Sequence, residues 1–160
     1  EEGVLFPDND ERAIFFAKGV VETVKKLNWV PDIIHVHGWM AALLPVYMKY
    51  FYKDEALFAN TKIVTSVYGQ SFDGNLDMEL MNKVSFDGIP AEAIKDLETP
   101  NYENIIKTSV LHSDAVIVAS EALSPSLTKF IESSKKPFLP FASKDKFAEA
   151  YTDFYKKMLL

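Results

Sequence analysis

Apolar side chains recur at steps of three and four residues over several stretches of the chain, the pattern of one face of an amphipathic helix. The clearest stretch follows the capping residues Asp8-Asn9-Asp10 and ends near Leu27, with charged side chains on its other face. Pro45 stands near the start of a second stretch and is expected in the first turn of that helix or at a kink. The pattern predicts helices over residues 8–27, 41–52 and 99–111, a helix opened by Ser120 or by Ser124-Pro125, and a last helix from about Ser143.

Short runs of β-branched and apolar residues separate these helices, and such runs predict buried strands. They cover residues 33–37, 62–67 and 114–119. Residues 136–141 carry two prolines and therefore suit an edge strand or an extended crossing. Because helices and strands alternate along the chain, we expect the α/β class, a doubly wound parallel sheet flanked by helices.

The segment between residues 68 and 98 is the least regular part of the sequence. Gly69, Gly74, Gly88 and Pro90 interrupt it, which leaves room for two short helices. A long, loop-rich insertion in a compact domain often carries function or contacts a partner. This segment is therefore a candidate for a functional role.

Composition narrows the possible functions and surroundings of the chain. Its 160 residues suffice for one ordinary domain with a real core, and 48% of them are hydrophobic. A net charge of -6 argues against a nucleic-acid partner, which would favour a basic patch. No apolar stretch is long enough to cross a bilayer, so no membrane partner is expected. The sequence contains no cysteine, which rules out disulfides and thiolate metal ligands and fits a cytoplasmic location.

Two histidines, His35 and His37, occupy alternate positions in the strand predicted over residues 33–37. Side chains alternate along a strand, so both histidines are expected on the same face of the sheet. His37 stands at the end of the strand, just before Gly38, and ligands of open α/β sheets bind outside the carboxyl ends of the strands. His37 is therefore the best candidate site residue in the sequence.

Other signs of chemistry are sparse. The six glycines form no phosphate-binding loop, and no G-x-S-x-G nucleophile motif occurs. His35 and His37 could supply two metal ligands, but catalytic zinc usually takes three, and His112 stands at the end of a predicted helix. One buried, hydrogen-bonded histidine and one histidine in a cleft therefore explain the pair better than a metal site. Trp39 could stack on a sugar ring or pack against the edge of the sheet.

The residues around the two histidines resemble a family signature. The signature residues are Trp29, Pro31-Asp32-Ile33-Ile34-His35-Val36-His37-Gly38-Trp39, Ala42-Leu43 and Pro45, preceded by Asp8-Asn9-Asp10-Glu11-Arg12-Ala13 with Phe15-Phe16 and followed by Ser113-Asp114-Ala115-Val116 through Ser120. Together these segments resemble the N-terminal half of bacterial glycogen synthase and plant starch synthase. The likeness extends from about residue 6 to residue 131.

This resemblance implies both a fold and an activity. The fold would be Rossmann-like, one half of the two-domain GT-B glycosyltransferase architecture. Members of the family transfer glucose from ADP-glucose or UDP-glucose to the non-reducing end of an α-1,4-glucan and need no metal. An α-glucan or a nucleotide sugar is thus the expected partner, and no cofactor is expected beyond the donor ADP-glucose. By the same resemblance His37 maps onto the histidine next to the transferred glucose, so it is implied as catalytic and, with Trp39, as substrate-binding.

Several positions depart from the pattern of the family. Gly38 stands where Asp is usual, Met40 where His or Gln is common, and the segment from Thr65 lacks the usual His-Asn pair. Residues 147–155 look like the helix with which the family's chain returns from its second domain, so that domain is expected to be skipped.

The resemblance also suggests how the chain is divided. The expected organisation is an N-terminal-like α/β domain over residues 1–141 with a truncated start, and a helix over residues 142–160 that packs back on it. The chain begins Glu1-Glu2-Gly3 without a Met, and we expect it to be a piece of a longer polypeptide.

Three functions are compatible with these features. The first is a glucosyltransferase domain that is inactive as this chain alone. The second is a non-catalytic module that binds a glucan, a nucleotide sugar or a partner protein. In either case a second copy or another protein would cover the open cleft face. A metal-binding α/β domain is the third possibility.

Overall fold

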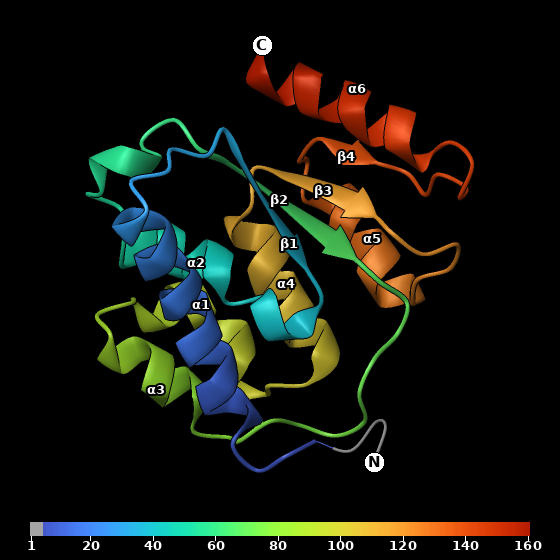
Figure 1. The fold of residues 1–160 in the computed structure, drawn as a ribbon. Coiled ribbons are helices and arrows are strands. Elements are labelled where there is room, and N and C mark those ends of the chain that lie inside the picture. Colours follow the sequence, from blue (N-terminus) through green and yellow to red (C-terminus); the bar gives the residue numbers. More distant parts are fainter. Residues whose placement is uncertain (1–4) are drawn as a thin grey trace.

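Four parallel strands form one sheet in the order β1-β2-β3-β4 (Figure 1). The strands are β1 (Ile33–His37), β2 (Lys62–Val67), β3 (Ala115–Val118) and β4 (Phe138–Leu139). The structure is a computed structural model that describes residues 5–160, so the predicted start of the domain at residues 1–4 lies outside the described residues. The expected α/β class with a parallel sheet is confirmed, and the proline-flanked β4 is an edge strand.

Helices cover the two faces of this sheet unequally (Figure 1). The helices are α1 (Asn9–Lys26), α2 (Leu44–Tyr50), α3 (Leu80–Phe86), α4 (Tyr102–His112), α5 (Pro125–Ser133) and α6 (Phe147–Leu159). Three short 3-10 helices are η1 (Trp39–Ala41), η2 (Ala56–Phe58) and η3 (Ala91–Glu98). Helices α1 to α5 contribute to the larger core on one face, and α6 packs on the other. Within residues 5–160, no helix combines the length and the apolar character needed to cross a membrane.

The alternation of side chains along the strands decides which residue meets which layer. Along β2, Ile63 and Val67 belong to the larger core, whereas Val64 belongs to the small cluster beneath α6. The partners of Val64 in that cluster are Ala115 and Ile117 of β3. The face under α6 is therefore thinly covered, and it is the face toward which the two histidines of β1 project.

Local chemistry fixes the starts of α2 and α5. The Ser124 hydroxyl accepts the backbone N–H of Leu127 at 3.2 Å, and Pro125 takes the first helical position. Helix α5 therefore starts at the second of its two expected places. Pro45 lies in the first turn of α2, where its missing N–H costs no helical hydrogen bond.

Two other helices begin later than expected. Helix α4 starts at Tyr102 because Asn101 caps it, with Oδ1 accepting the N–H of Asn104 at 2.9 Å. Helix α6 starts at Phe147 and not near Ser143. The Ser143 carbonyl accepts the N–H groups of Lys146 and Phe147, both at 2.9 Å, which makes a separate turn before the helix.

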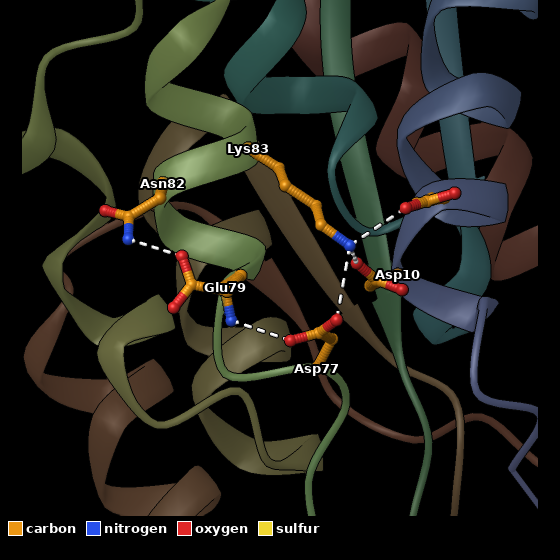
Figure 2. Close-up of polar contacts among 6 residues, drawn as sticks. Asp10, Asp77, Glu79, Asn82 and Lys83 are labelled. Carbon is orange, nitrogen blue, oxygen red and sulfur yellow. Dashed lines mark hydrogen bonds and ion pairs between the residues drawn. The ribbon is translucent and has the colours of Figure 1, made fainter.

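The irregular segment after β2 contains the short helices α3 and η3, and Lys83 ties it to α1 (Figure 2). Nζ of Lys83 lies 2.6 Å from Oδ2 of Asp10, 3.0 Å from Oε1 of Glu11 and 3.3 Å from Oδ2 of Asp77. The Asp10 side chain is fully buried, and its Oδ1 has no hydrogen-bond partner among the described residues. Lys83 is therefore the countercharge of a buried carboxylate, and it fixes α3 against the first turn of α1.

Candidate functional site

His35 and His37 lie side by side on the α6 face of β1, as strand alternation predicts. Their ring centroids are 3.9 Å apart, with the ring planes tilted by 44°. His37 ends the strand, and Gly38 then turns the chain at a φ of 73°, a conformation that suits glycine. The two rings are thus in direct contact at the carboxyl end of β1.

His35 is part-buried and has hydrogen-bond partners for both ring nitrogens. Nε2 lies 2.8 Å from Oγ of Ser66 on β2, and Nδ1 lies 2.5 Å from the hydroxyl oxygen of Tyr155 on α6. Burial and, to a smaller extent, the neighbouring His37 lower the pKa of His35 to about 4. At neutral pH the His35 ring is therefore uncharged and fully engaged in hydrogen bonds.

His37 is exposed and faces a cleft. Its Nδ1 lies 2.7 Å from the hydroxyl oxygen of Tyr68, and within residues 5–160 Nε2 makes no hydrogen bond. Partial desolvation lowers its pKa below the ordinary value, so the ring is neutral near pH 7. A neutral imidazole with one nitrogen unoccupied can donate or accept a hydrogen bond at that atom.

The cleft beside His37 has a volume of about 960 Å³. Its walls come from the start of the chain, the turn after β1, the segment after β2 and the first residue of α4: Leu5, Phe6, Asn9, His37, Gly38, Trp39, Met40, Tyr68, Gln70, Ser71, Phe72 and Tyr102. Trp39 meets Phe72 edge-to-face at 5.1 Å and also packs against the larger core. The cleft thus offers an apolar wall next to one free imidazole nitrogen.

A smaller hollow of about 300 Å³ adjoins this cleft, and both are lined by Tyr68 and Tyr102. The amino ends of α4 and α5 meet there, and the carboxylate of Glu103 accepts a hydrogen bond from the Ser124 hydroxyl at 2.5 Å. That hydrogen bond holds the pKa of Glu103 below its ordinary value. A negative charge of the chain itself therefore occupies the place where helix ends would attract an anion.

The structure places His112 and Asp32 away from this cleft. His112 lies at the end of α4, where Nδ1 donates to the Thr108 carbonyl at 2.8 Å and the ring meets Tyr50 edge-to-face. Asp32 is a turn residue whose carbonyl accepts the N–H of Lys62. Within residues 5–160, no group of three or more His, Cys, Asp or Glu side chains is arranged to hold a metal ion.

The sequence reasoning missed three residues that surround the histidines. Ser66 and Tyr68 follow Val64 at alternate positions, so strand alternation could have placed them on the histidine face. The sequence offered only a weak indication that Tyr155 belongs to the site. Tyr155 lies one helical turn after Tyr151, and this spacing is also typical of ordinary core packing. Its contact with His35 joins residues 120 positions apart.

Comparison with known proteins relates the chain to one family. A family model described as the starch synthase catalytic domain matches residues 1–131. The glycogen synthase of Thermotoga maritima is 35% identical over 116 residues, which are 71% of this chain and 23% of that protein. The glycogen synthase of Elusimicrobium minutum is 33% identical over 132 residues, which are 81% of this chain and 26% of that protein. The chain therefore spans about a quarter of the length of these relatives.

The fold has a counterpart among solved structures. The catalytic domain of starch synthase IV from Arabidopsis thaliana, solved with bound ADP and acarbose, is similar with a TM-score of 0.64 at 17% identity. The match covers 89% of this chain and 32% of that one, and it supports the expected glycosyltransferase-type α/β fold. The resemblance seen around the two histidines is thus confirmed over most of the sequence, and the chain belongs to the glycogen and starch synthase family.

Proposed function

We propose that the chain is a glycogen and starch synthase-type glucosyltransferase domain whose cleft binds a glucosyl unit at His37. In the complete reaction, glucose would pass from ADP-glucose to an α-1,4-glucan, as part of glycogen biosynthesis in the cytoplasm. The observation that carries the proposal is the free Nε2 of His37 at the mouth of the 960 Å³ cleft. Family membership supports a sugar as the occupant of that cleft.

His37 and Trp39 would have different tasks in sugar binding. A neutral imidazole held by Tyr68 can exchange a hydrogen bond with a sugar hydroxyl from a fixed position. The ring of Trp39, backed by Phe72, offers an apolar surface suited to the face of a sugar. His37 would then orient the donor glucose, while Trp39 shapes the pocket around it.

The charge of the cleft bears on whether this chain transfers glucose by itself. Departure of a nucleoside diphosphate requires cations or backbone donors aimed at the developing negative charge. Among the described residues that line the cleft there is no Lys or Arg, and the adjoining hollow contains Glu103. We therefore expect little or no transfer by this chain alone.

The lack of Lys and Arg among the described residues of the cleft also favours a second candidate function, a module that binds glucan without transferring glucose. A neutral maltooligosaccharide needs no cation in its binding site, whereas ADP-glucose carries a diphosphate. A cleft with an aromatic wall and no cationic lining suits the neutral ligand better. The first candidate requires that the chain bind ADP-glucose, whereas the second requires only glucan binding, so the ligand preference separates them.

The test uses the purified chain and two titrations. Calorimetry with maltooligosaccharides and with ADP-glucose should detect binding of at least one of them. His37→Ala should weaken that binding about tenfold or more, because a hydrogen bond from a positioned group is lost. His112→Ala is the matched control, since His112 lies away from the cleft, and its affinity should equal that of the parent chain.

Activity is measured separately, with labelled ADP-glucose and a glycogen primer. Labelled glucan formed by the chain alone would refute the expected inactivity and favour the first candidate. Because both candidates predict no labelled product, the titrations separate them: binding of ADP-glucose would favour the first candidate, and binding of glucan alone would favour the binding module. Absence of binding to both ligands would overturn the sugar site at His37.

A further inference from the structure

Helix α6 lies over the sheet face that carries His35 and His37 (Figure 1). Among the helices in residues 5–160, it is the one whose side chains pack on this face, and none of its own residues is buried. Its apolar side chains Tyr151, Phe154 and Met158 rest on the small cluster formed by β2 and β3. Because this packing is shallow, a polar contact between α6 and the sheet adds to the attachment.

Such a contact is the hydrogen bond between the Tyr155 hydroxyl and Nδ1 of His35, at 2.5 Å. The other ring nitrogen of His35 is held by Ser66 at 2.8 Å. A neutral imidazole carries its proton on one nitrogen and accepts at the other. Two partners on opposite sides of the ring therefore fix its plane, and because both are hydroxyls, each can donate to the ring or accept from it.

The position of His35 is passed on to His37 by direct contact. The two ring centroids are 3.9 Å apart, so a rotation of the His35 ring would displace the His37 ring. On its other side His37 is held by the Tyr68 hydroxyl at 2.7 Å. His37 is thus clamped between the His35 ring and Tyr68, with Nε2 left for a ligand.

We propose that Tyr155 is a positioning residue of the cleft: its hydroxyl donates to Nδ1 of His35, locks that ring, and thereby orients His37 toward the ligand. The effect on the ligand rests on the proposed function of His37, whereas the effect on the histidine rings does not. In this arrangement His35 carries its proton on Nε2 and donates it to Oγ of Ser66. Helix α6 is then a part of the binding site although its residues do not line the cleft.

A pair of matched substitutions on α6 tests this role. Tyr155→Phe removes the hydroxyl and keeps the ring, so the packing on the sheet remains. Tyr151→Phe removes the same atom one helical turn earlier, where within residues 5–160 the hydroxyl makes no hydrogen bond although the ring lies 5.9 Å from that of His35. Thermal unfolding of both variants shows whether the fold is retained.

The primary measurement is a long-range proton–nitrogen NMR spectrum of the imidazole rings at neutral pH. The parent chain should show His35 in the Nε2-protonated form. Tyr155→Phe should give a mixture of tautomers at His35 and shifted ring signals at His37, whereas Tyr151→Phe should resemble the parent. Tyr155→Phe should also weaken maltooligosaccharide or ADP-glucose binding about three- to tenfold, the size expected for one lost positioning hydrogen bond.

Each contrary result has a distinct meaning. Unchanged His35 signals in Tyr155→Phe would overturn the hydrogen bond, and changed His35 with unchanged His37 signals would overturn the transmission to His37. Equal effects of the two substitutions would reduce Tyr155 to a packing residue. If the parent binds neither ligand, the proposed function of the cleft fails, and the NMR spectra still decide whether Tyr155 positions the two histidines.

Discussion

The three histidines of the chain all have surroundings that favour their neutral form. Burial is the main cause in each case. At His35 burial acts together with the nearby His37, since a charge on one ring disfavours a charge on the other, and the two lower the pKa of His35 to about 4. These rings therefore act as hydrogen-bond partners at neutral pH and not as cations.

This environment predicts how stability depends on pH. In the unfolded chain His35 binds a proton near pH 6.5, whereas in the folded chain it does so only near pH 4. The contribution of the neutral His35 ring to the free energy of unfolding is therefore fully present above pH 6.5 and is lost as the pH falls toward 4. At about 1.4 kcal/mol per unit of pKa shift, the loss for His35 is about 3 kcal/mol at most.

Urea denaturation at a series of pH values between 7 and 4 checks this prediction. The free energy of unfolding should fall over that range. The fall should be smaller in His35→Gln, which replaces the titrating ring by a neutral amide. A free energy of unfolding that stays constant or rises as the pH falls from 6.5 to 4.5 would contradict the prediction.

At the scale of elements, the ion cluster at Lys83 holds the irregular segment against α1 (Figure 2). The Asp10 carboxylate is fully buried, so removal of its countercharge leaves a desolvated negative charge. Lys83→Met should lower the free energy of unfolding by about 2 kcal/mol, less than for a fully enclosed pair because Lys83 still reaches solvent.

The control for this variant is Lys95→Met, since Lys95 pairs with Glu92 on the surface and both side chains are largely exposed. That change should cost less than about 0.5 kcal/mol. Chemical denaturation of both variants gives the comparison. Equal losses of stability would show that burial of Asp10 has no special weight.

Two glycines are expected to respond to alanine in opposite directions. Gly19 lies inside α1, and an added Cβ would meet no atom within 4 Å, so Gly19→Ala should raise the free energy of unfolding by about 0.5–1 kcal/mol. At Gly69 an added Cβ would lie 2.3 Å from the carbonyl oxygen of Ala122, so Gly69→Ala should lower it by about 1–3 kcal/mol. Thermal or chemical unfolding of the pair decides, and the same sign for both would contradict the prediction.

At the scale of the whole molecule, large apolar side chains are exposed beside α1. Phe15 and Phe86 are 79% and 92% exposed, and they flank a groove of about 790 Å³ between α1 and α3. Contiguous exposed apolar surface of this kind marks an interaction site more often than free surface. The sequence led us to expect a second copy of the chain or another protein over the cleft face; this groove is a separate apolar surface that a second copy would bury, and the oligomeric state tests that occupant.

Sedimentation velocity over a series of concentrations measures the proposed self-association. The parent chain should sediment faster than a monomer at high concentration, and Phe86→Glu should restore the monomer because it introduces a charge into the apolar contact. Phe141→Glu changes an exposed aromatic residue that follows β4 and does not line the groove, so it should leave the association intact. A parent chain that stays monomeric throughout the series would contradict the proposal.

Local patterns in the sequence were sufficient for much of the architecture. Helical spacing and β-branched runs predicted the helices and the strands, because both are set by the backbone period and by which side chains avoid water. The spacing of His35 and His37 likewise predicted that the two rings share a face. Cap positions were less certain, since Asn101 and Ser143 could be placed only by their actual hydrogen bonds.

The sequence by itself therefore determined the order of elements, the parallel sheet, the family and the candidacy of His37. Only the tertiary structure decided which partners those residues meet: Tyr155 against His35 across 120 positions, and Lys83 against Asp10 across 73. A periodic pattern states which side of an element is buried, but it does not state what lies opposite. Polar groups far apart in the chain find their partners only when packing brings their elements together, and so the contact of Tyr155 with His35 emerged from the fold alone.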